Sequence, residues 1–341
     1  MQSIIFRPWG LLPWVINKLP LTKWNFLGCL SFEERCLAAF EALFAATLVD
    51  KLRFHAIQDP PSSYWQSLGT GLSERRRAFL RLGGRPSDLE SHDLFERAEL
   101  LVSSIKDFIN VSNGNIIVDV SSFPKRFFLP ILRLVIEAKE VRNLLVTYTV
   151  PAGYSNDPLA EDPEPWRHIP LFAPPFPEPK LQVVLVALGF ETLGLPDLIE
   201  HDYHDVELRL LFPFPPGPPG FQRSWECVRK LEAGLPQQFR EPVRVHALDI
   251  SEAFDHMLSA TDNGKRYSLL APYGPKPISV AMGIFATLSN MPIYYTQPRA
   301  YNPNYSSGIK VIDNQPQVFA YCIRLEGRNL YELTCSPAQL P

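Results

Sequence analysis

Short apolar segments alternate with longer amphipathic segments along the chain. In the first half, the apolar segments predict four strands, at residues 26–30, 52–57, 116–120 and 144–149. The amphipathic segments predict helices at residues 32–48, 64–82, 94–109 and 125–139. The strands are apolar on both faces, which is typical of a parallel sheet covered by helices on each side. We therefore expect an α/β fold made of Rossmann-like parallel-sheet units with right-handed crossovers.

Three short motifs occur in the same order in both halves of the chain. They are a strand that ends in Leu-(Ser/Gly)-Phe-Glu, a strand followed by Pro-Lys and an apolar helix, and the pattern Tyr-Thr-x-Pro-x-x-Tyr. They lie at residues 30–33, 116–125 and 148–154, and again at residues 188–191, 267–276 and 295–301. The spacing between copies drifts by about 11 residues, which differences in loop length can absorb. We therefore expect two tandem units that arose by internal duplication and are related by a pseudo-twofold axis.

Proline clusters set the expected boundaries. Residues 158–180 contain eight prolines, which forbid regular helix, so we expect a stiff connector there. It separates a first Rossmann-like repeat at 23–157 from a second at 181–310. Residues 1–22 form an N-terminal arm that is expected to pack on the protein's own core, with docking on a partner protein as the alternative. Residues 311–341 are expected to form a C-terminal β-hairpin.

The composition excludes several classes of protein. The chain has 341 residues, 46% of them hydrophobic, which supports a large core and excludes a disordered or fibrous protein. A net charge of -3 gives no general attraction to nucleic acid or to an anionic membrane. We expect no direct nucleic-acid binding, and the one route to it would be the basic run Arg75, Arg76 and Arg77.

Cysteine usage and the start of the chain bear on its location. The five cysteines include no Cys-x-x-Cys pair, which fits neither a disulfide framework nor a zinc ribbon. The first 21 residues are apolar but are interrupted by charged residues, glycine and prolines, so they match neither a signal peptide nor a membrane span. We therefore expect a cytoplasmic protein with no membrane partner.

Each repeated motif falls where a parallel strand ends, which is where ligands bind in open α/β sheets. Two copies related by a pseudo-twofold axis would place the motifs across one shared cleft. The expected ligand-binding residues are Glu33, Lys125, Tyr148, Thr149, Tyr154, Glu191, Gly274, Lys276, Tyr295, Thr296 and Tyr301.

The chemistry of these residues suggests an anionic, aromatic ligand. Lys125 and Lys276 begin helices, where backbone N–H groups favour phosphate; the alternative is that Pro-Lys is only a helix-start signal. The tyrosines and threonines offer rings and hydroxyls to a base and a ribose, or they simply brace their loops. Glu33 and Glu191 are favoured at helix starts whatever the function, and a symmetric carboxylate pair would also suit acid/base chemistry.

Familiar enzyme motifs are missing from the sequence. It contains no Walker loop, no Gly-x-Gly-x-x-Gly, no Gly-x-Ser-x-Gly and no His-Glu-x-x-His. His201 and His204 have a spacing found in metal sites, but they lie in an expected surface segment and have no counterpart in the first half. We therefore predict no metal ion and no cofactor, and the sequence favours a protein that is not an enzyme.

One segment resembles a known family. Leu269-Leu-Ala-Pro-Tyr-Gly-Pro-Lys-Pro-Ile-Ser279 is similar to the strand–Gly-Thr-Lys–helix element of CRISPR-associated Rossmann fold (CARF) sensor domains. Gly274 and Lys276 match the glycine and lysine of that element, and Pro275 replaces its threonine; in the first half only Lys125 matches. The resemblance covers about ten residues and implies two fused Rossmann-like units that bind a cyclic or linear oligonucleotide. Related sensors carry an attached effector domain, for which two repeats and a hairpin leave no room, so a separate effector protein is implied.

These observations lead to three hypotheses. The first is a cytosolic sensor or regulatory subunit, in a bacterial antiviral defence system, that binds a nucleotide-type ligand between the repeats and acts on a separate effector. The second is a phosphodiesterase or nucleotide hydrolase that uses Lys125, Lys276 and one of Glu33 or Glu191 in the same cleft. The third is a scaffold subunit without a ligand that assembles through its aromatic N-terminus.

Overall fold

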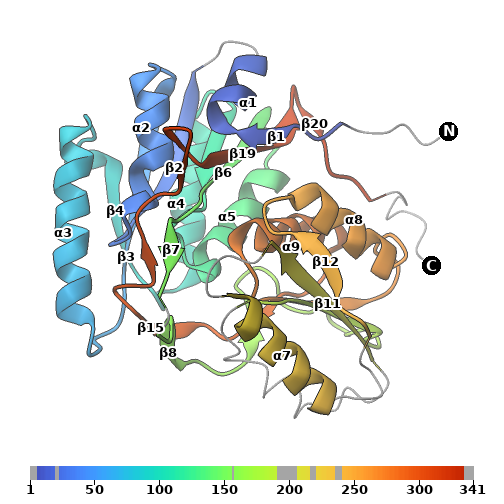
Figure 1. Cartoon of the computed structure of the whole chain (residues 1–341). Coiled ribbons are helices and arrows are strands. Elements are labelled where there is room, and N and C mark those ends of the chain that lie inside the picture. The colour runs from blue at the N-terminus through green and yellow to red at the C-terminus, as the bar shows by residue number, and fades with distance from the viewer. Residues whose placement is uncertain are drawn as a thin grey trace. The chain divides into compact units, whose positions relative to one another are not determined.

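The chain folds into two compact α/β units (Figure 1). The computed structural model describes residues 6–19, 23–155, 157–189, 206–215, 220–234 and 240–333. Unit 1 comprises Met1–Glu161 and Arg299–Tyr331, and unit 2 comprises Asp162–Pro298 and Glu332–Pro341. The expected connector therefore belongs largely to unit 2, where β9 (Arg167–His168) pairs with β14 (Tyr294–Tyr295).

Unit 1 is built on a mainly parallel sheet with the strand order β1-β19-β6-β5-β2-β3-β4. Strands β2 to β6 run parallel, whereas β19 pairs antiparallel with β6, β1 and β20. The strands span β1 Trp9–Leu11, β2 Trp24–Leu30, β3 Val49–Gln58, β4 Leu89–Asp93, β5 Asn115–Asp119, β6 Asn143–Thr149, β19 Val318–Leu325 and β20 Arg328–Asn329.

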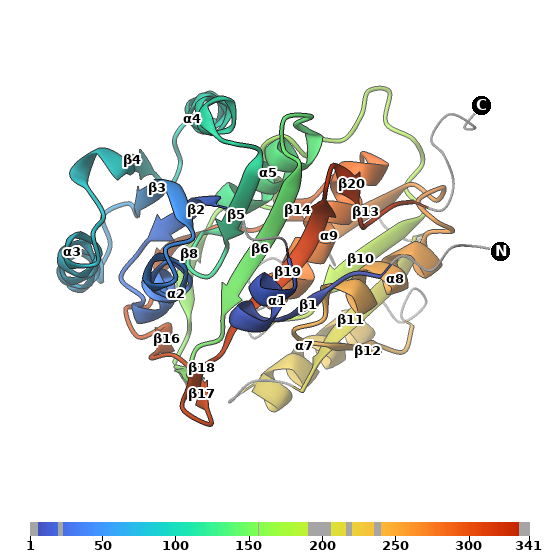
Figure 2. The same cartoon turned by 90° about the horizontal axis from the view of Figure 1, so that it is seen from above.

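Helices cover both faces of this sheet (Figure 2). Helices α2 and α3 lie on one face and α4 and α5 on the other, as right-handed crossovers require. The helices span α1 Leu12–Lys18, η1 Glu34–Leu37, α2 Ala38–Ala45, α3 Trp65–Arg81, η2 Pro86–Asp88, α4 Ala98–Val111 and α5 Lys125–Glu137. The four strands predicted in the first half are all present, and helix cover on both faces explains why β2, β5 and β6 are almost entirely buried, whereas β3 is only partly buried.

Unit 2 contains a smaller sheet of four parallel strands with the order β12-β11-β10-β13. Beyond β13, Leu270 forms a parallel bridge with Ile293. The strands span β10 Val183–Ala187, β11 Glu207–Phe214, β12 Val243–His246 and β13 Ser268–Pro272, and the helices span α7 Gly220–Gly234, α8 Ile250–Ala260 and α9 Lys276–Ser289.

The remaining strands are short. They span β7 Gly153–Tyr154, β8 Ala160–Pro163, β15 Pro298–Tyr301, β16 Ser306–Ser307, β17 Val311–Ile312 and β18 Gln315–Pro316. The pairing of β7 with β16 and of β6 with β19 joins the segment after residue 299 to unit 1. The fold therefore assigns residues 299–310 to unit 1, whereas the sequence pattern placed them in the second repeat.

The two sheets share one strand order. In each unit the first parallel strand, β2 or β10, is central, the next two lie on one side of it and the fourth lies on the other, as in β4-β3-β2-β5 and β12-β11-β10-β13. This order is common to many Rossmann-like sheets, so the shared order establishes the fold class and does not by itself establish duplication.

Strands near both ends of the described chain belong to the sheet of unit 1. Trp9 in β1 stacks on Tyr321 of β19 with ring centroids 5.9 Å apart, so this part of the N-terminal arm covers the protein's own core. Strands β19 and β20 form the expected hairpin, and Gly327 in its turn has a φ of 82°, which residues with side chains rarely adopt. Within the described segments, no helix has the length and apolarity needed to cross a membrane.

Candidate functional site

A buried ion pair joins the carboxyl ends of β2 and β6 in unit 1. Arg35, in η1 just after β2, donates from Nε to Glu33 Oε2 at 2.9 Å and from Nη1 to the backbone carbonyl of Thr149 at 3.0 Å. Its Nη2 lies 2.8 Å from the same oxygen of Glu33. Burial alone would lower the pKa of Arg35, but the charge of Glu33 and the neighbouring tyrosines raise it well above its usual value. The guanidinium is therefore charged, and its carboxylate partner is held in place.

Tyrosine side chains surround this ion pair. The guanidinium of Arg35 lies 5.5 Å from the ring centroid of Tyr148, and the hydroxyls of Tyr148 and Tyr154 are 3.2 Å apart. The ring of Tyr305 lies 6.0 Å from Tyr154 and 6.2 Å from Tyr301. Tyr148 is buried, whereas the other three are partly exposed and can present ring edges and hydroxyls to a ligand.

Hydroxyl groups bind the end of β5 to the end of β6. Asp119 Oδ1 accepts hydrogen bonds from Ser121 Oγ at 2.6 Å and from Thr147 Oγ1 at 3.0 Å. The backbone N–H of Thr149 donates to Ser121 Oγ at 2.8 Å. Thr149 itself is fully buried, so its position supports a bracing role in the loop more than contact with a ligand.

Lys125 and Lys276 occupy matching places in the two units. Lys125 is the first residue of α5 and follows the N-cap Pro124, and Lys276 is the first residue of α9 and follows the N-cap Pro275. Both side chains are partly exposed. Each lysine thus stands at a helix N-terminus beyond the carboxyl end of a parallel strand, as the Pro-Lys pattern predicted.

Gly274 allows two loops of unit 2 to approach closely. A Cβ atom at Gly274 would lie 2.9 Å from the carbonyl oxygen of Leu188 and 3.0 Å from Ala187 Cβ. From the other loop, a Cβ at Gly189 would lie 2.0 Å from the carbonyl oxygen of Tyr273. Packing between the ends of β10 and β13 is therefore enough to explain both glycines.

Aromatic side chains also line the end of β13. The hydroxyl of Tyr273 lies 2.9 Å from Thr296 Oγ1, and its ring centroid lies 5.4 Å from that of Tyr295. Trp166 stacks on Tyr273 with an interplanar angle of 11° and centroids 6.0 Å apart. The loop that begins at Tyr295 is thus held by a set of stacked rings.

The structure groups the sequence-predicted residues in two places. In unit 1, five of them meet around Arg35 and Tyr305: Glu33, Tyr148, Thr149, Tyr154 and Tyr301. In unit 2, Gly274, Tyr295 and Thr296 meet around Tyr273 and the end of β10. Tyr301 falls in unit 1, because the boundary between the units lies between Pro298 and Arg299. Glu191, His201 and His204 lie outside the described residues.

Sequence reasoning missed Arg35, which contacts Glu33, Tyr148 and Thr149 at the unit 1 edge. It lies two residues after Glu33, but the matching residue of the second motif is Leu193, so a search for repeated residues passes over it. Ser306, whose hydroxyl donates to Glu33 Oε2, lies far from the motif in the sequence and gave no signal.

Metal-ligand geometry occurs at one place within the described part of the chain. His55, Glu90 and His92, on β3 and β4 of unit 1, offer ligand atoms that all lie within 4.8 Å of one another. The four described cysteines, Cys29, Cys36, Cys227 and Cys322, are buried, and no disulfide joins any two of them.

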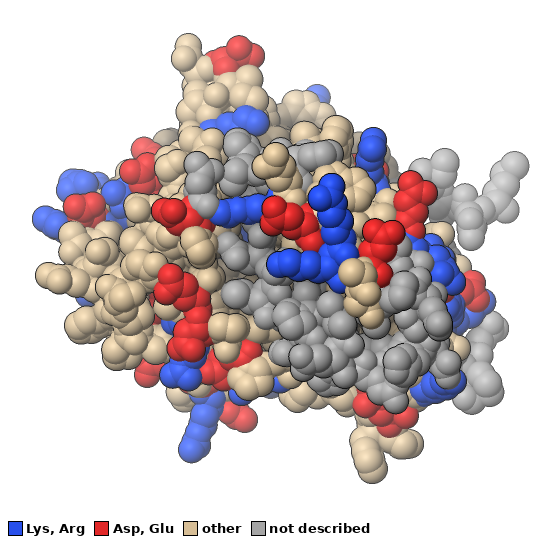
Figure 3. Space-filling model, turned by 60° about the horizontal axis from the view of Figure 1, so that its bottom comes forward, with Lys and Arg blue, Asp and Glu red and all other residues tan. Residues whose placement is uncertain are grey.

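Surface charge gives little support to nucleic-acid binding. On the face drawn in Figure 3, the Lys and Arg side chains are interspersed with Asp and Glu side chains, and the described atoms of that face form no continuous basic area. Arg76 and Arg77 are exposed on α3, and Arg75 is partly exposed, with its guanidinium 3.6 Å from Glu74. A strong electrostatic interaction with nucleic acid needs many concentrated cationic contacts.

Comparison with known proteins leaves the function open. No protein-family model matches the chain, and no curated protein matches it. A functionally unknown protein from Pseudomonas aeruginosa PAO1 is 12% identical over 81% of this chain and 92% of its own, with a TM-score of 0.23. A universal stress protein from Archaeoglobus fulgidus DSM 4304 is 11% identical over 82% of this chain and 97% of its own, also with a TM-score of 0.23. At such values neither protein carries an argument about this chain.

Proposed function

We propose that this protein is a cytoplasmic sensor or regulatory subunit that binds a nucleotide-type ligand at the carboxyl edges of its two parallel sheets. The supporting observation is the repeated placement of Lys125 and Lys276 as the first residue of a helix beyond a parallel strand. At such positions a lysine ammonium and backbone N–H groups of the first helical turn can bind the same anion. Neighbouring tyrosines would contact a base or a ribose.

The register of the sheets supports two copies of one unit. Leu27 of β2 pairs with Arg53 of β3, and Leu185 of β10 pairs with Arg209 of β11. Matching Leu27 with Leu185, as the Leu-(Ser/Gly)-Phe-Glu motifs require, therefore also matches the two arginines.

The third motif, Tyr-Thr-x-Pro-x-x-Tyr, fits the same register of paired strands. On the other side of β2, Leu27 pairs with Val118 of β5, which in turn pairs with Val146 of β6. On the other side of β10, Leu185 pairs with Leu270 of β13, which in turn bridges to Ile293. Tyr148 lies two residues after Val146, and Tyr295 lies two residues after Ile293. The Pro-Lys motif is offset by one residue, because Lys125 lies seven residues after Val118 and Lys276 lies six after Leu270. The agreement of the other two motifs with one register supports duplication, and duplicated edges suit a ligand that has repeated chemical groups.

The proposed mode of action is binding without chemical turnover. Glu33, the candidate acid or base of the described chain, is buried and engaged by Arg35 and Ser306. A carboxylate held in this way is a poor proton acceptor, because the ion pair stabilises its charged form. Ligand binding at the two sheet edges would be communicated to a separate effector protein. The CARF-like segment at Gly274 and Lys276 suggests that the protein acts in a bacterial antiviral defence system.

A ligand screen tests the proposal. The melting temperature of the purified chain is measured with mononucleotides, cyclic dinucleotides and cyclic or linear oligonucleotides, and the nucleosides without phosphate serve as controls. We expect at least one phosphate-bearing compound to raise the melting temperature, since a ligand at 100 times its Kd stabilises a protein by about 2.7 kcal/mol. If no phosphorylated compound does better than its nucleoside, the proposal is wrong.

Stoichiometry and product analysis separate the remaining alternatives. One ligand per chain in calorimetry agrees with the single shared site that the sequence predicts, and two per chain agree with independent edges. Hydrolysis of the bound compound in the presence of Mg²⁺ would favour the phosphodiesterase hypothesis. A partner protein that co-purifies, is lost when the N-terminal arm is deleted and does not depend on any nucleotide would favour the scaffold hypothesis.

A further inference from the structure

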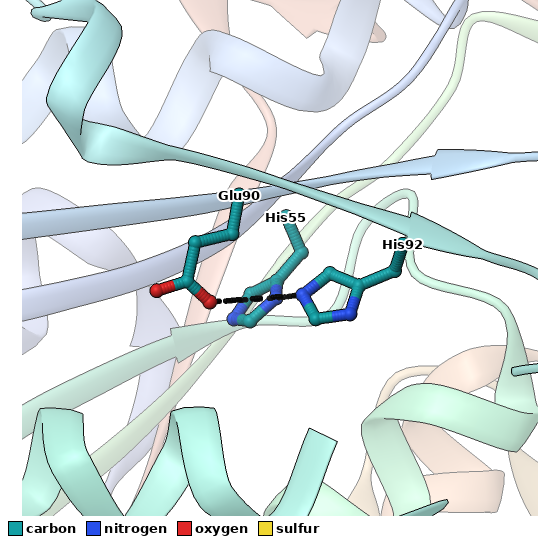
Figure 4. A group of neighbouring side chains, drawn as sticks. All are labelled: His55, Glu90 and His92. Carbon is teal, nitrogen blue, oxygen red and sulfur yellow. Dashed lines mark hydrogen bonds and ion pairs between the residues drawn. The ribbon is translucent and has the colours of Figure 1, made fainter. Parts of the chain in front are cut away.

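Two histidines and a glutamate lie together under the helices of unit 1 (Figure 4). His55 is on β3, and Glu90 and His92 are on the neighbouring strand β4. Phe127 of α5 lies 6.1 Å from His92, ring to ring, and Ser104 of α4 donates to Glu90 Oε2. The three side chains therefore lie on the sheet face that α4 and α5 cover.

The distances among their polar atoms come close to the spacing of metal ligands, and the two imidazole nitrogens, hydrogen-bonded to each other in the metal-free chain, would move apart to about 3.3 Å around a tetrahedral ion. His55 Nδ1 lies 2.7 Å from His92 Nε2, and Glu90 Oε2 lies 4.0 Å from the first atom and 3.7 Å from the second. A point equidistant from these three atoms is about 2.1 Å from each, within the range of zinc–nitrogen and zinc–oxygen bonds.

We propose that His55, Glu90 and His92 form a binding site for a divalent transition-metal ion, with Zn²⁺ as the best match. Two imidazole nitrogens and one carboxylate oxygen are a donor set that this class of ion prefers over Mg²⁺ or Ca²⁺, which take mainly oxygen ligands. The side chain of Glu90 is 33% exposed, so water can reach the fourth position of a tetrahedral ion.

Outer contacts orient two of the three ligands. His92 Nδ1 lies 2.5 Å from Glu96 Oε1, which directs the other nitrogen, Nε2, towards Glu90 and His55. Glu90 Oε1 lies 3.2 Å from Arg53 Nε, which leaves Oε2 facing the histidines. A carboxylate on the second ring nitrogen of a histidine is the usual outer support of a metal ligand.

The fold alone gives no reason for polar side chains here. In unit 2 the same strand pairings place Leu211 opposite Val243, and Pro213 opposite Val245, so apolar residues serve at the corresponding positions. His55 is completely buried, and its Nε2 has no hydrogen-bond partner among the described residues. Burying an imidazole in this way is costly, and a bound ion offsets that cost through the other ring nitrogen.

Metal titration of the whole chain tests the proposal directly. The protein is dialysed against a chelator, the chelator is removed, and ZnCl₂ is titrated in competition with a chromophoric chelator. We expect one Zn²⁺ per wild-type chain. The Glu90→Gln and His92→Gln variants should each bind at least ten-fold more weakly, and His246→Gln, which changes an exposed histidine of β12, should bind like wild type.

A folding control and a spectroscopic signature complete the test. Circular dichroism without metal shows whether each variant is folded. If the His92→Gln protein is not folded, the Glu90→Gln protein alone is compared with wild type. Co²⁺ in place of Zn²⁺ should give the intense visible absorption of a tetrahedral site in wild type and lose it in Glu90→Gln. Wild-type protein that binds no stoichiometric Zn²⁺, or a folded Glu90→Gln protein that binds it as tightly as wild type, would overturn the proposal. Neither result depends on the proposed nucleotide ligand.

Discussion

The guanidinium of Arg35 donates a hydrogen bond of 3.0 Å to the backbone carbonyl of Thr149, 114 residues further along the chain. The same guanidinium forms an ion pair with Glu33, so one side chain connects the loop after β2 to the end of β6. Both ends of this connection belong to the edge at which we propose ligand binding. The stability of the edge therefore depends on a charge pair that water does not reach.

We expect Arg35→Ala to destabilise the protein by about 3–5 kcal/mol, because it leaves the buried Glu33 carboxylate without its partner. Urea unfolding followed by circular dichroism measures this loss. The matched control is Arg133→Ala, which breaks the ion pair between Arg133 and the half-exposed Glu137 on α5. This variant should lose no more than about 1 kcal/mol of stability. Equal stability of the two variants would contradict the assigned role of Arg35. A double variant with Glu33→Leu and Arg35→Met should recover part of the loss.

Gly274 offers a second test, of packing at the unit 2 edge. We expect Gly274→Ala to cost about 1–3 kcal/mol, because the new Cβ would lie 2.9 Å from a backbone oxygen that cannot move aside without shifting the loop. Gly69→Ala is the control: it lies inside α3 with no atom within 4 Å of the new Cβ, so it should stabilise the protein by about 0.5–1 kcal/mol. Opposite signs in thermal unfolding are the expected result. A stabilising Gly274→Ala would mean that the close approach of the two loops is wrong.

Asp59, just after β3, should make stability depend on pH. Burial raises the pKa of this carboxyl to about 7, well above its usual value of 3.8. As pH rises from about 4 to 7, the unfolded chain loses this proton before the folded protein does, so folding is progressively disfavoured and the full cost is present above pH 7. Asp59→Asn should therefore stabilise the protein by about 1–3 kcal/mol at pH 8 and by little at pH 4. Melting curves at both pH values check this, with the exposed Asp107→Asn as control. A benefit of equal size at both pH values would contradict the raised pKa of Asp59.

Much of the fold follows from apolar periodicity. The strands and helix starts around Lys125 and Lys276 lie where the sequence predicts them, because β5 and β13 are short, buried and mostly apolar, and a proline immediately precedes the first residue of α5 and of α9. Strand β4 could not be found in this way. Of its five residues only His92 is buried, so this edge strand has no apolar pattern, and its pairing with β3 is a long-range property.

The candidate functional residues also differ in whether the sequence pattern can reveal them. Repetition locates residues that have a counterpart in the other half, such as Tyr148 and Tyr295. It cannot locate Arg35, whose counterpart position holds a leucine, or His55 and His92, which meet only because two strands pair. Metal ligands from separate strands carry no fixed spacing in sequence, so their geometry becomes visible only when the register is known.

The last prediction concerns the two helix-start lysines. Suppose that Lys125 and Lys276 each bind a phosphate of the compound that raises the melting temperature in the nucleotide screen. Each charge-assisted contact should then contribute about 1.5–3 kcal/mol to binding. Replacing either lysine by alanine should then weaken binding of that compound about ten-fold or more. Because both side chains are partly exposed, the melting temperature without the compound should change little.

A charge control separates anion binding from helix-start chemistry. Lys125→Arg and Lys276→Arg keep the positive charge and should retain more binding than the alanine variants, whereas Lys106→Ala, on α4, should bind like wild type. If the double variant Lys125→Ala, Lys276→Ala binds the compound as tightly as wild type, the lysines hold no anion. The repeated Pro-Lys pair would then be a helix-start signal, because proline at the N-cap fixes the entry of the chain into α5 and α9 whatever residue follows it.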